Sequence, residues 1–216
     1  IYSESWALII GINKYQNVPQ LNYAVEDAKS IKTLLNTQYG FPEENITMLL
    51  DEKATKNNIT NAFYTLVEKT GPDDVIVVFY AGHGETQDIP GGKDNLGYWI
   101  PIDRKMGNLP GTALSVKTIN IHSNEIPAKS MLFLVDACYG GLAAAGNYRS
   151  NRQLDIIKSV TKDRCRQIIT AGKKEEQVLE NEKWHHSAFT RVLLDGLQHL
   201  KADDDKDGIV MANQLY

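Results

Sequence analysis

The chain has 216 residues, a length that suits one α/β domain and allows a sizeable core without disulfides or metals to hold it. Its 42% hydrophobic and 23% charged residues are typical of a soluble globular protein, and its apolar runs are far too short to span a membrane. With a net charge of −4 and no dense basic run, it is not expected to bind nucleic acid or an anionic membrane. The first residues lack the features of a signal peptide, so we expect a cytoplasmic protein.

Five short apolar runs, each bounded by turn residues, are typical of strands buried on both faces of a parallel sheet. In chain order they are Trp6–Ile12, Ile46–Leu50, Val75–Ala81, Met131–Val135 and the weaker Gln167–Ala171. Three other segments carry apolar residues at three- and four-residue steps, which predicts amphipathic helices. They are Leu21–Leu35, Ile59–Val67 and Ala188–Leu197. The alternation predicts an α/β sandwich with a mostly parallel central sheet and helices on both faces, with a loop over Gly82–Gly97.

A histidine between two glycines follows the third of these strands. His83 comes directly after Val75–Ala81, and active sites of parallel α/β sheets form where the carboxyl ends of strands meet their loops. The neighbouring glycines leave room for a substrate backbone, and Gly84 can offer an unobstructed N–H. By itself the motif is explained as readily by a turn that exposes a histidine.

A cysteine follows the next strand in the same way. Cys138 lies past the end of Met131–Val135, beside Asp136 and before two glycines, which is a rim position instead of the core position usual for a lone cysteine. A thiol becomes a strong nucleophile beside a base, and an imidazole suits that role and the later protonation of a leaving amine. Because neighbouring strands end at one edge, we expect Cys138 to meet His83, with the backbone N–H groups of Gly84 and Cys138 as oxyanion donors.

These segments resemble the caspase, metacaspase and bacterial orthocaspase families of cysteine peptidases. The stretches Phe79–Gly84 and Val135–Gly141 are similar to the two signature blocks of those families, with the histidine upstream of the cysteine. Ala7–Asn13 and Leu21–Ala28 resemble the first strand and helix of the family, and Phe189–Leu197 resembles a late helix. The resemblance covers nearly the whole chain and implies a caspase-like three-layer sandwich.

The resemblance implies a cysteine endopeptidase in which Cys138 forms a thioester acyl-enzyme and His83 shuttles the proton. Asp27 and the Asp-Ala-Cys sequence make the chain more similar to metacaspases than to animal caspases. In metacaspases the acids that match Asp27 and Asp136 line the S1 pocket and bind Arg or Lys, and paired carboxylates in a partly dry pocket favour a cation. The expected partner is therefore a protein or peptide with Arg or Lys at P1. From the residues alone, Asp27 can also be a solvated carboxylate near the start of a helix.

An acidic stretch near the end of the chain is similar to the first half of an EF-hand calcium loop. Asp203, Asp205 and Asp207 have the spacing of the first three ligands, and Gly208 stands at the sharp turn. The twelfth position is Gln214 instead of the bidentate glutamate, which favours an acidic turn or a weak site over a tight calcium site. The acidic cluster through which calcium activates some metacaspases has no match. We therefore expect no cofactor and no metal, with weak calcium binding as the alternative.

A basic segment, residues 143–166, divides the chain into a large-subunit-like part, residues 1–142, and a small-subunit-like part, residues 167–216, which we expect to be truncated at its C-terminus. A solvated linker explains such a segment. A peptidase that prefers Arg or Lys would also find bonds to cut there, and the resemblance implies self-cleavage of this kind in a zymogen. His185 and His186, just before the last predicted helix, are expected to be cap or surface residues.

Three alternatives to this function remain open at this point. An Asp-directed peptidase of the same clan is disfavoured by the two acids and by the lack of an evident arginine pair. A catalytically silent or partner-activated caspase-like interaction module is disfavoured by the presence of both His83 and Cys138. A calcium-binding regulatory module would use the acidic stretch Asp203–Gln214.

Overall fold

The computed structural model describes residues 2–88, 95–137, 164–171, 180–181, 183–198 and 201–203. Within them, a five-stranded sheet in the order β2-β1-β3-β7-β8 is parallel throughout. Its strands are β1 (Ser5–Gly11), β2 (Ile46–Leu50), β3 (Val75–Ala81), β7 (Ser130–Asp136) and β8 (Cys165–Thr170). All five predicted strands are present, two of them with the predicted bounds, and the predicted α/β sandwich with a parallel central sheet is confirmed.

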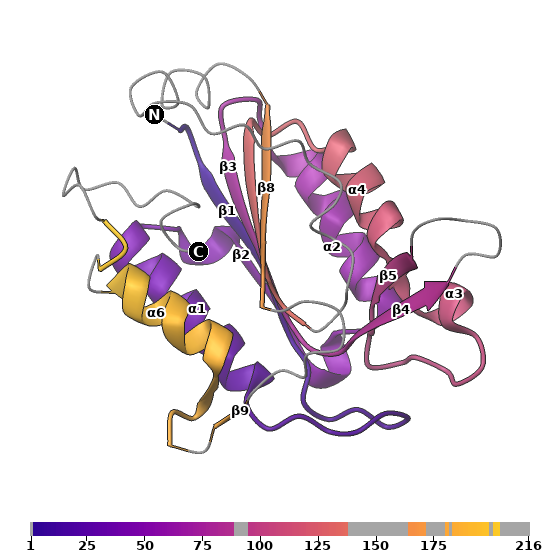
Figure 1. Ribbon diagram of the computed structural model, residues 1–216. Coiled ribbons are helices and arrows are strands. Elements are labelled where there is room, and N and C mark those ends of the chain that lie inside the picture. Colours follow the sequence, from indigo (N-terminus) through magenta and orange to yellow (C-terminus); the bar gives the residue numbers. More distant parts are fainter. Residues whose placement is uncertain are drawn as a thin grey trace.

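Helices cover both faces of this sheet (Figure 1). One layer holds α1 (Ala24–Tyr39) and α6 (Ala188–Gln198), and the other holds α2 (Lys56–Lys69) and α4 (Val116–Glu125), with the short α3 (Leu109–Thr112) nearby. The three predicted helices are confirmed, whereas the sequence analysis predicts neither α3 nor α4. Because both faces are covered, each strand sends alternate side chains into two separate cores. Leu8 and Ile10 of β1 lie in the core with α2 and α4, and Ala7 and Ile9 lie in the core with α1 and α6.

The prediction of a loop over Gly82–Gly97 is wrong. An antiparallel sheet in the order β4-β5-β6 stands beside the central sheet and is formed by β4 (Gly84–Asp88), β5 (Asn95–Trp99) and β6 (Leu114–Ser115). The β4 sequence has no large apolar side chain, so its strand character comes from pairing with β5 and not from a local pattern. A second small pair joins β9 (Glu180–Asn181) to β10 (His186–Ser187).

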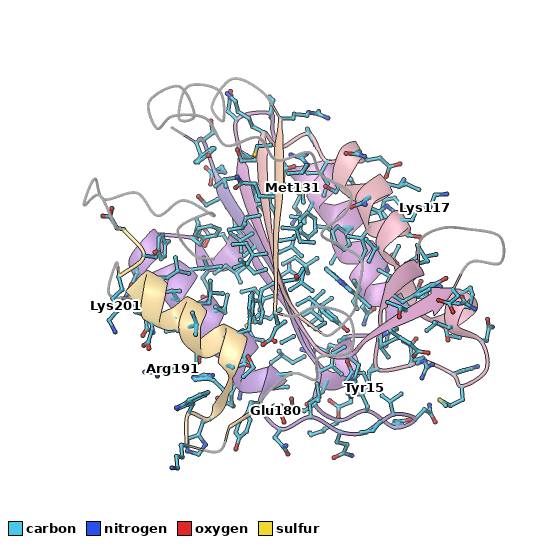
Figure 2. All side chains as sticks on the ribbon, viewed as in Figure 1. Tyr15, Lys117, Met131, Glu180, Arg191 and Lys201 are labelled. Atoms are coloured by element: carbon cyan, nitrogen blue, oxygen red, sulfur yellow. The ribbon has the colours of Figure 1, made fainter. Side chains whose placement is uncertain are left out.

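The carboxyl ends of the parallel strands lie together at one end of the sheet. Figure 2 shows Tyr15, which follows β1, and Glu180 near this lower end, and Met131 of β7 near the opposite end. The helix α1 comes very close to the end of β1, since a Cβ at Gly11 would lie only 2.5 Å from the carbonyl oxygen of Ala24. Only glycine allows this approach, which brings the first turn of α1 against the sheet edge.

No helix in the part of the chain described here is both long and apolar enough to cross a membrane.

Candidate active site

His83 lies between the end of β3 and the start of β4, at the carboxyl edge of the parallel sheet. Its Nε2 atom is 2.7 Å from the backbone carbonyl oxygen of Pro19, in the segment between β1 and α1. Because a carbonyl oxygen can only accept, Nε2 carries the proton and Nδ1 of the neutral ring carries the lone pair. The half-buried imidazole is therefore oriented as a base that accepts a proton at Nδ1.

Gly82 and Gly84 fix the backbone on either side of this histidine. The N–H of Gly82 donates to the carbonyl of Asp136 at 3.2 Å, which ties the end of β3 to the end of β7. Gly84 pairs with Trp99, and the neighbouring pair is hydrogen-bonded, since the N–H of Ile100 donates to the carbonyl of His83. Hydrogen-bonded pairs alternate with non-bonded ones in an antiparallel ladder, so the N–H of Gly84 points away from β5. This orientation suits the oxyanion donor expected at Gly84.

Cys138 lies outside the described residues. In the register of β3 and β7, Ala81 is paired with Asp136. His83 and Cys138 each follow one member of this pair by two residues along the chain.

Asp27 and Asp136 form a buried acid pair at the same edge. Their exposed fractions are 1% and 2%, so Asp27 is not the solvated carboxylate that a position in the first turn of a helix allows. Ser187 connects the two, since its N–H donates to Asp27 Oδ2 at 3.3 Å and its hydroxyl donates to Asp136 Oδ2. The hydroxyl of Thr190 donates to the same Asp136 oxygen at 3.0 Å.

Burial shifts the ionisation of this pair. Desolvation raises the pKa of Asp27 to about 7, and hydrogen bonds from Ser187 counteract only part of that rise. Desolvation likewise raises the pKa of Asp136 to about 7, with the charge of Asp27 as a further contribution. Within the described residues, the second oxygen of Asp136, Oδ1, is buried and accepts no hydrogen bond. A bound cation would compensate both the buried charge and this unsatisfied acceptor.

The expectation that His186 is a cap or surface residue is wrong. Its half-buried ring lies with Nδ1 2.6 Å from Asp27 Oδ1. Burial lowers the pKa of His186, the nearby Arg191 lowers it further, and Glu26 counteracts this shift. His185 is exposed, as expected, with a backbone φ of 53°. The helix cap of α6 is provided instead by Ser187, whose hydroxyl oxygen accepts the N–H of Thr190 at 2.9 Å.

Glu180 is a further acidic residue of this region that the sequence did not indicate. Its carboxylate accepts the backbone N–H groups of Asn22 and Tyr23, both at 2.9 Å. These two N–H groups lie at and just before the N-cap of α1, Tyr23, where the helix dipole favours a negative charge. Glu180 thereby joins β9 to the start of the helix that carries Asp27, and its charge contributes to the raised pKa of Asp27.

Two predicted features lie wholly or mostly outside the described residues. The basic segment 143–166 is described only from residue 164, and there Cys165 and Arg166 already belong to β8. Of the acidic stretch Asp203–Gln214, only Asp203 is described, so the expectation of no metal, with weak calcium binding as the alternative, stays a prediction. Among the residues that the structure describes, no cluster of three or more His, Cys, Asp or Glu side chains could hold a metal ion.

Comparison with known proteins was made by sequence and by structure. The chain is 34% identical over 149 residues to Metacaspase-1 of Eremothecium gossypii, covering 63% of this chain and 32% of that protein. It is 32% identical over 148 residues to Metacaspase-1A of Aspergillus oryzae, covering 63% of this chain and 34% of that protein. The chain thus spans about a third of the length of these curated relatives.

Solved structures show the same fold. A protein from Geobacter sulfurreducens superposes with a TM-score of 0.66 at 18% identity, covering 91% of this chain and 83% of that one. Caspase-1 from Spodoptera frugiperda superposes with a TM-score of 0.58 at 14% identity, covering 92% and 70% of the two chains. The family model of the Caspase domain matches residues 4–212. The chain therefore belongs to the caspase domain family, a family of cysteine peptidases.

Proposed function

We propose that the chain is a cysteine endopeptidase that cleaves peptide bonds after Arg or Lys. The observation that carries this proposal is the buried pair of Asp27 and Asp136, with one carboxylate oxygen that accepts no hydrogen bond within the described residues. Such a pair attracts a guanidinium or ammonium group and repels an acidic P1 side chain. The metacaspase relatives support the same class of enzyme.

In the proposed reaction, the Cys138 thiolate attacks the carbonyl carbon of the P1 residue, with His83 as the base that takes the thiol proton. The N–H groups of Gly84 and Cys138 stabilise the oxyanion of the tetrahedral intermediate. As the C–N bond breaks, His83 returns its proton to the leaving amine and a thioester remains. Water then attacks the thioester, again with His83 as base, and releases the acid product and the thiol. The Pro19 carbonyl supports these proton transfers because it keeps Nδ1 of His83 as the reactive nitrogen. No cofactor takes part.

Fluorogenic peptides that differ only at P1 test this function. We expect turnover after Arg and Lys but not after Asp, and we expect none in Cys138→Ala. Asp136→Asn should lower kcat/KM for the Arg peptide by at least about tenfold, since one charge of the pair is lost. Asp88→Asn, which changes an exposed aspartate of β4, is the matched control and should leave kcat/KM unchanged.

The outcomes separate the alternatives. Cleavage after Asp would retain a peptidase but refute the role of the acid pair. Absence of turnover with every peptide, with and without calcium, would favour the catalytically silent or partner-activated module instead. A calcium dependence of the rate would contradict the proposal that no metal is needed.

Self-cleavage in the basic segment is part of the same proposal. Arg166 is half-buried in β8, and its guanidinium donates to four backbone carbonyls, so it is a poor P1 residue. We expect the cuts to follow basic residues earlier in the segment, at Arg149, Arg152, Lys158 or Lys162. Intact-mass analysis of wild type and Cys138→Ala tests this expectation. Absence of any cut in the active protein, or the same cut in both proteins, would refute it.

A further inference from the structure

The hydrogen-bond ladder between β4 and β5 opens at His83. The ladder ends at the pair of Gly84 and Trp99. The next two residues outward, His83 and Ile100, share one direct hydrogen bond, from the N–H of Ile100 to the carbonyl of His83 at 3.1 Å. In a regular ladder the N–H of His83 would donate back to the carbonyl of Ile100. Instead it donates to the hydroxyl oxygen of Tyr15 at 3.0 Å, and this hydroxyl donates to the Ile100 carbonyl at 3.0 Å. The Tyr15 hydroxyl therefore stands between two strands in place of one backbone bond.

A second hydroxyl lies beside this gap but does not open it. The Tyr80 hydroxyl donates to the carbonyl of His83 at 2.7 Å, accepts the N–H of Ile100 at 3.1 Å and also lies 3.1 Å from the Ile100 carbonyl oxygen. The N–H of His83, however, donates to Tyr15. The direct bond between those two backbone groups is present as well. Tyr80 thus reinforces an existing contact, whereas Tyr15 replaces a missing one. The two tyrosines are buried to a similar degree, which makes them a matched pair for experiment.

Tyr15 also belongs to the segment that orients the imidazole of His83. That segment, between β1 and α1, carries Pro19, whose carbonyl accepts the Nε2 proton. The ring of Tyr15 packs against the imidazole with centroids 4.8 Å apart. The start of the segment is held by Asp51, whose Oδ1 accepts the N–H groups of Asn13 and Lys14 at 2.8 and 3.0 Å. One side chain therefore joins the backbone of His83 to the segment that fixes its ring.

We propose that Tyr15 is a positioning residue for His83, whose hydroxyl keeps the β4–β5 ladder open so that the imidazole stays aligned with the Pro19 carbonyl. The proposal rests on the proposed function in that His83 is the base. Removing the hydroxyl lets the N–H of His83 close onto the Ile100 carbonyl, which draws the histidine backbone away from Pro19. Burial raises the pKa of Tyr15, so the hydroxyl is neutral and does not itself exchange protons with a substrate. Gly82 is required beside it, since a Cβ there would lie 2.6 Å from the Tyr15 hydroxyl oxygen.

Three phenylalanine variants test the proposal. Tyr15→Phe removes the inserted hydroxyl, Tyr80→Phe removes a buried hydroxyl that leaves the direct bond in place, and Tyr64→Phe changes an exposed tyrosine of α2. We expect Tyr15→Phe to lower kcat for an Arg peptide by about tenfold or more with KM unchanged, since small displacements of a base cost that much. Tyr80→Phe should have a smaller effect on kcat for a similar loss of thermal stability, and Tyr64→Phe should have none.

A readout that does not depend on turnover separates this proposal from the proposed function. The ¹⁵N resonances of the His83 ring, assigned by comparison with His83→Gln, report which ring nitrogen carries the proton. The Pro19 carbonyl accepts a hydrogen bond only from a protonated Nε2, so losing this alignment in Tyr15→Phe should move the ring proton from Nε2 towards Nδ1 and change both ¹⁵N resonances. The same measurement on Tyr80→Phe should give nearly the wild-type resonances.

Each outcome supports or overturns the positioning role of Tyr15. Loss of the proton from Nε2 of His83 in Tyr15→Phe alone supports positioning even if the wild type cleaves no peptide, in which case only the proposed function fails. Equal effects of Tyr15→Phe and Tyr80→Phe on the His83 ¹⁵N resonances would overturn the proposal and leave Tyr15 as a residue of the core. If Tyr15→Phe does not fold, 3-fluorotyrosine at position 15 keeps the ring and hydroxyl but makes the oxygen a weaker acceptor. Unchanged His83 ¹⁵N resonances in that protein would equally overturn the proposal.

Discussion

Replacing Asp136 by Asn tests whether the buried acid pair lowers the stability of the folded protein when it ionises. Burial raises the pKa of Asp136 from 3.8 to about 7, and hydrogen bonds from Ser187 and Thr190 offset only part of that rise. A folded-state pKa above the unfolded-state value means that the unfolded chain ionises first, so stability falls as the pH rises between the two values. At about 1.4 kcal/mol per pKa unit, this shift corresponds to roughly 4 kcal/mol lost between about pH 4 and about pH 7.

Asp136→Asn removes the titrating group but keeps an oxygen for the hydroxyls of Ser187 and Thr190. We expect the free energy of unfolding of the variant minus that of the wild type, both measured with urea, to increase by about 2 to 4 kcal/mol from about pH 4 to about pH 8. The comparison is made as a difference between proteins because other groups titrate over the same range. Asp88→Asn is the control, and its stability should follow the wild type at both pH values. An identical pH dependence in Asp136→Asn and the wild type would refute the reasoning.

Four further predictions concern the site and its support. Gly82→Ala places a Cβ against the Tyr15 hydroxyl, so kcat should fall at least about tenfold while the circular dichroism spectrum stays native. An unchanged kcat would mean that the close contact between position 82 and Tyr15 does not affect the site. kcat/KM for an Arg peptide should rise as the pH passes about 7, because burial raises the pKa of Asp27 to about 7 and binding of a cation requires the ionised carboxylate. A flat profile over this range would show that ionisation of Asp27 does not control binding of the P1 cation. His186→Ala uncovers Asp27 Oδ1, so KM for the same peptide should fall severalfold, and a raised KM would mean that the imidazole assists binding. Arg166→Met keeps an apolar stem but removes a guanidinium that donates to four backbone carbonyls. Urea unfolding should show a loss of about 2 to 4 kcal/mol in the free energy of unfolding, and a loss below about 1 kcal/mol would count against this.

The parallel sheet could be predicted because its signal is local. The strands Ile46–Leu50 and Val75–Ala81 have the predicted bounds, since each apolar run is closed by turn or polar residues. The strand β8 begins at Cys165, two residues before the predicted start, because the N–H of Cys165 pairs with the Lys129 carbonyl across the sheet. Such a contact has no trace in the sequence near Cys165.

Other elements could not be predicted because their stabilising contacts are distant or polar. The buried face of α4 includes His122 and Ser123, which interrupt the apolar period that marks a helix. The strand β4 depends on a partner strand and has no apolar alternation of its own.

In the candidate site too, some positions follow from local sequence and others depend on contacts between distant residues. The position of His83 at a strand end follows from the sequence, and so does the position of Asp136. The bond from His186 to Asp27 spans 159 residues and that from Ser187 to Asp136 spans 51 residues, so no local pattern indicates either. The carbonyl of Pro19 that orients His83 is a backbone group, and no residue type marks it.

The acid pair also determines what a cut in the basic segment would do to the molecule. Asp27 and Asp136 come before that segment, whereas Ser187 and Thr190, which donate to them, come after it. The second piece also contributes β8, which pairs along its length with β7. Cleavage would therefore produce two chains that share one sheet and one buried polar network. Separating the two chains would leave two buried carboxyl groups without their hydrogen-bond donors. The cut form should therefore behave as a single non-covalent unit.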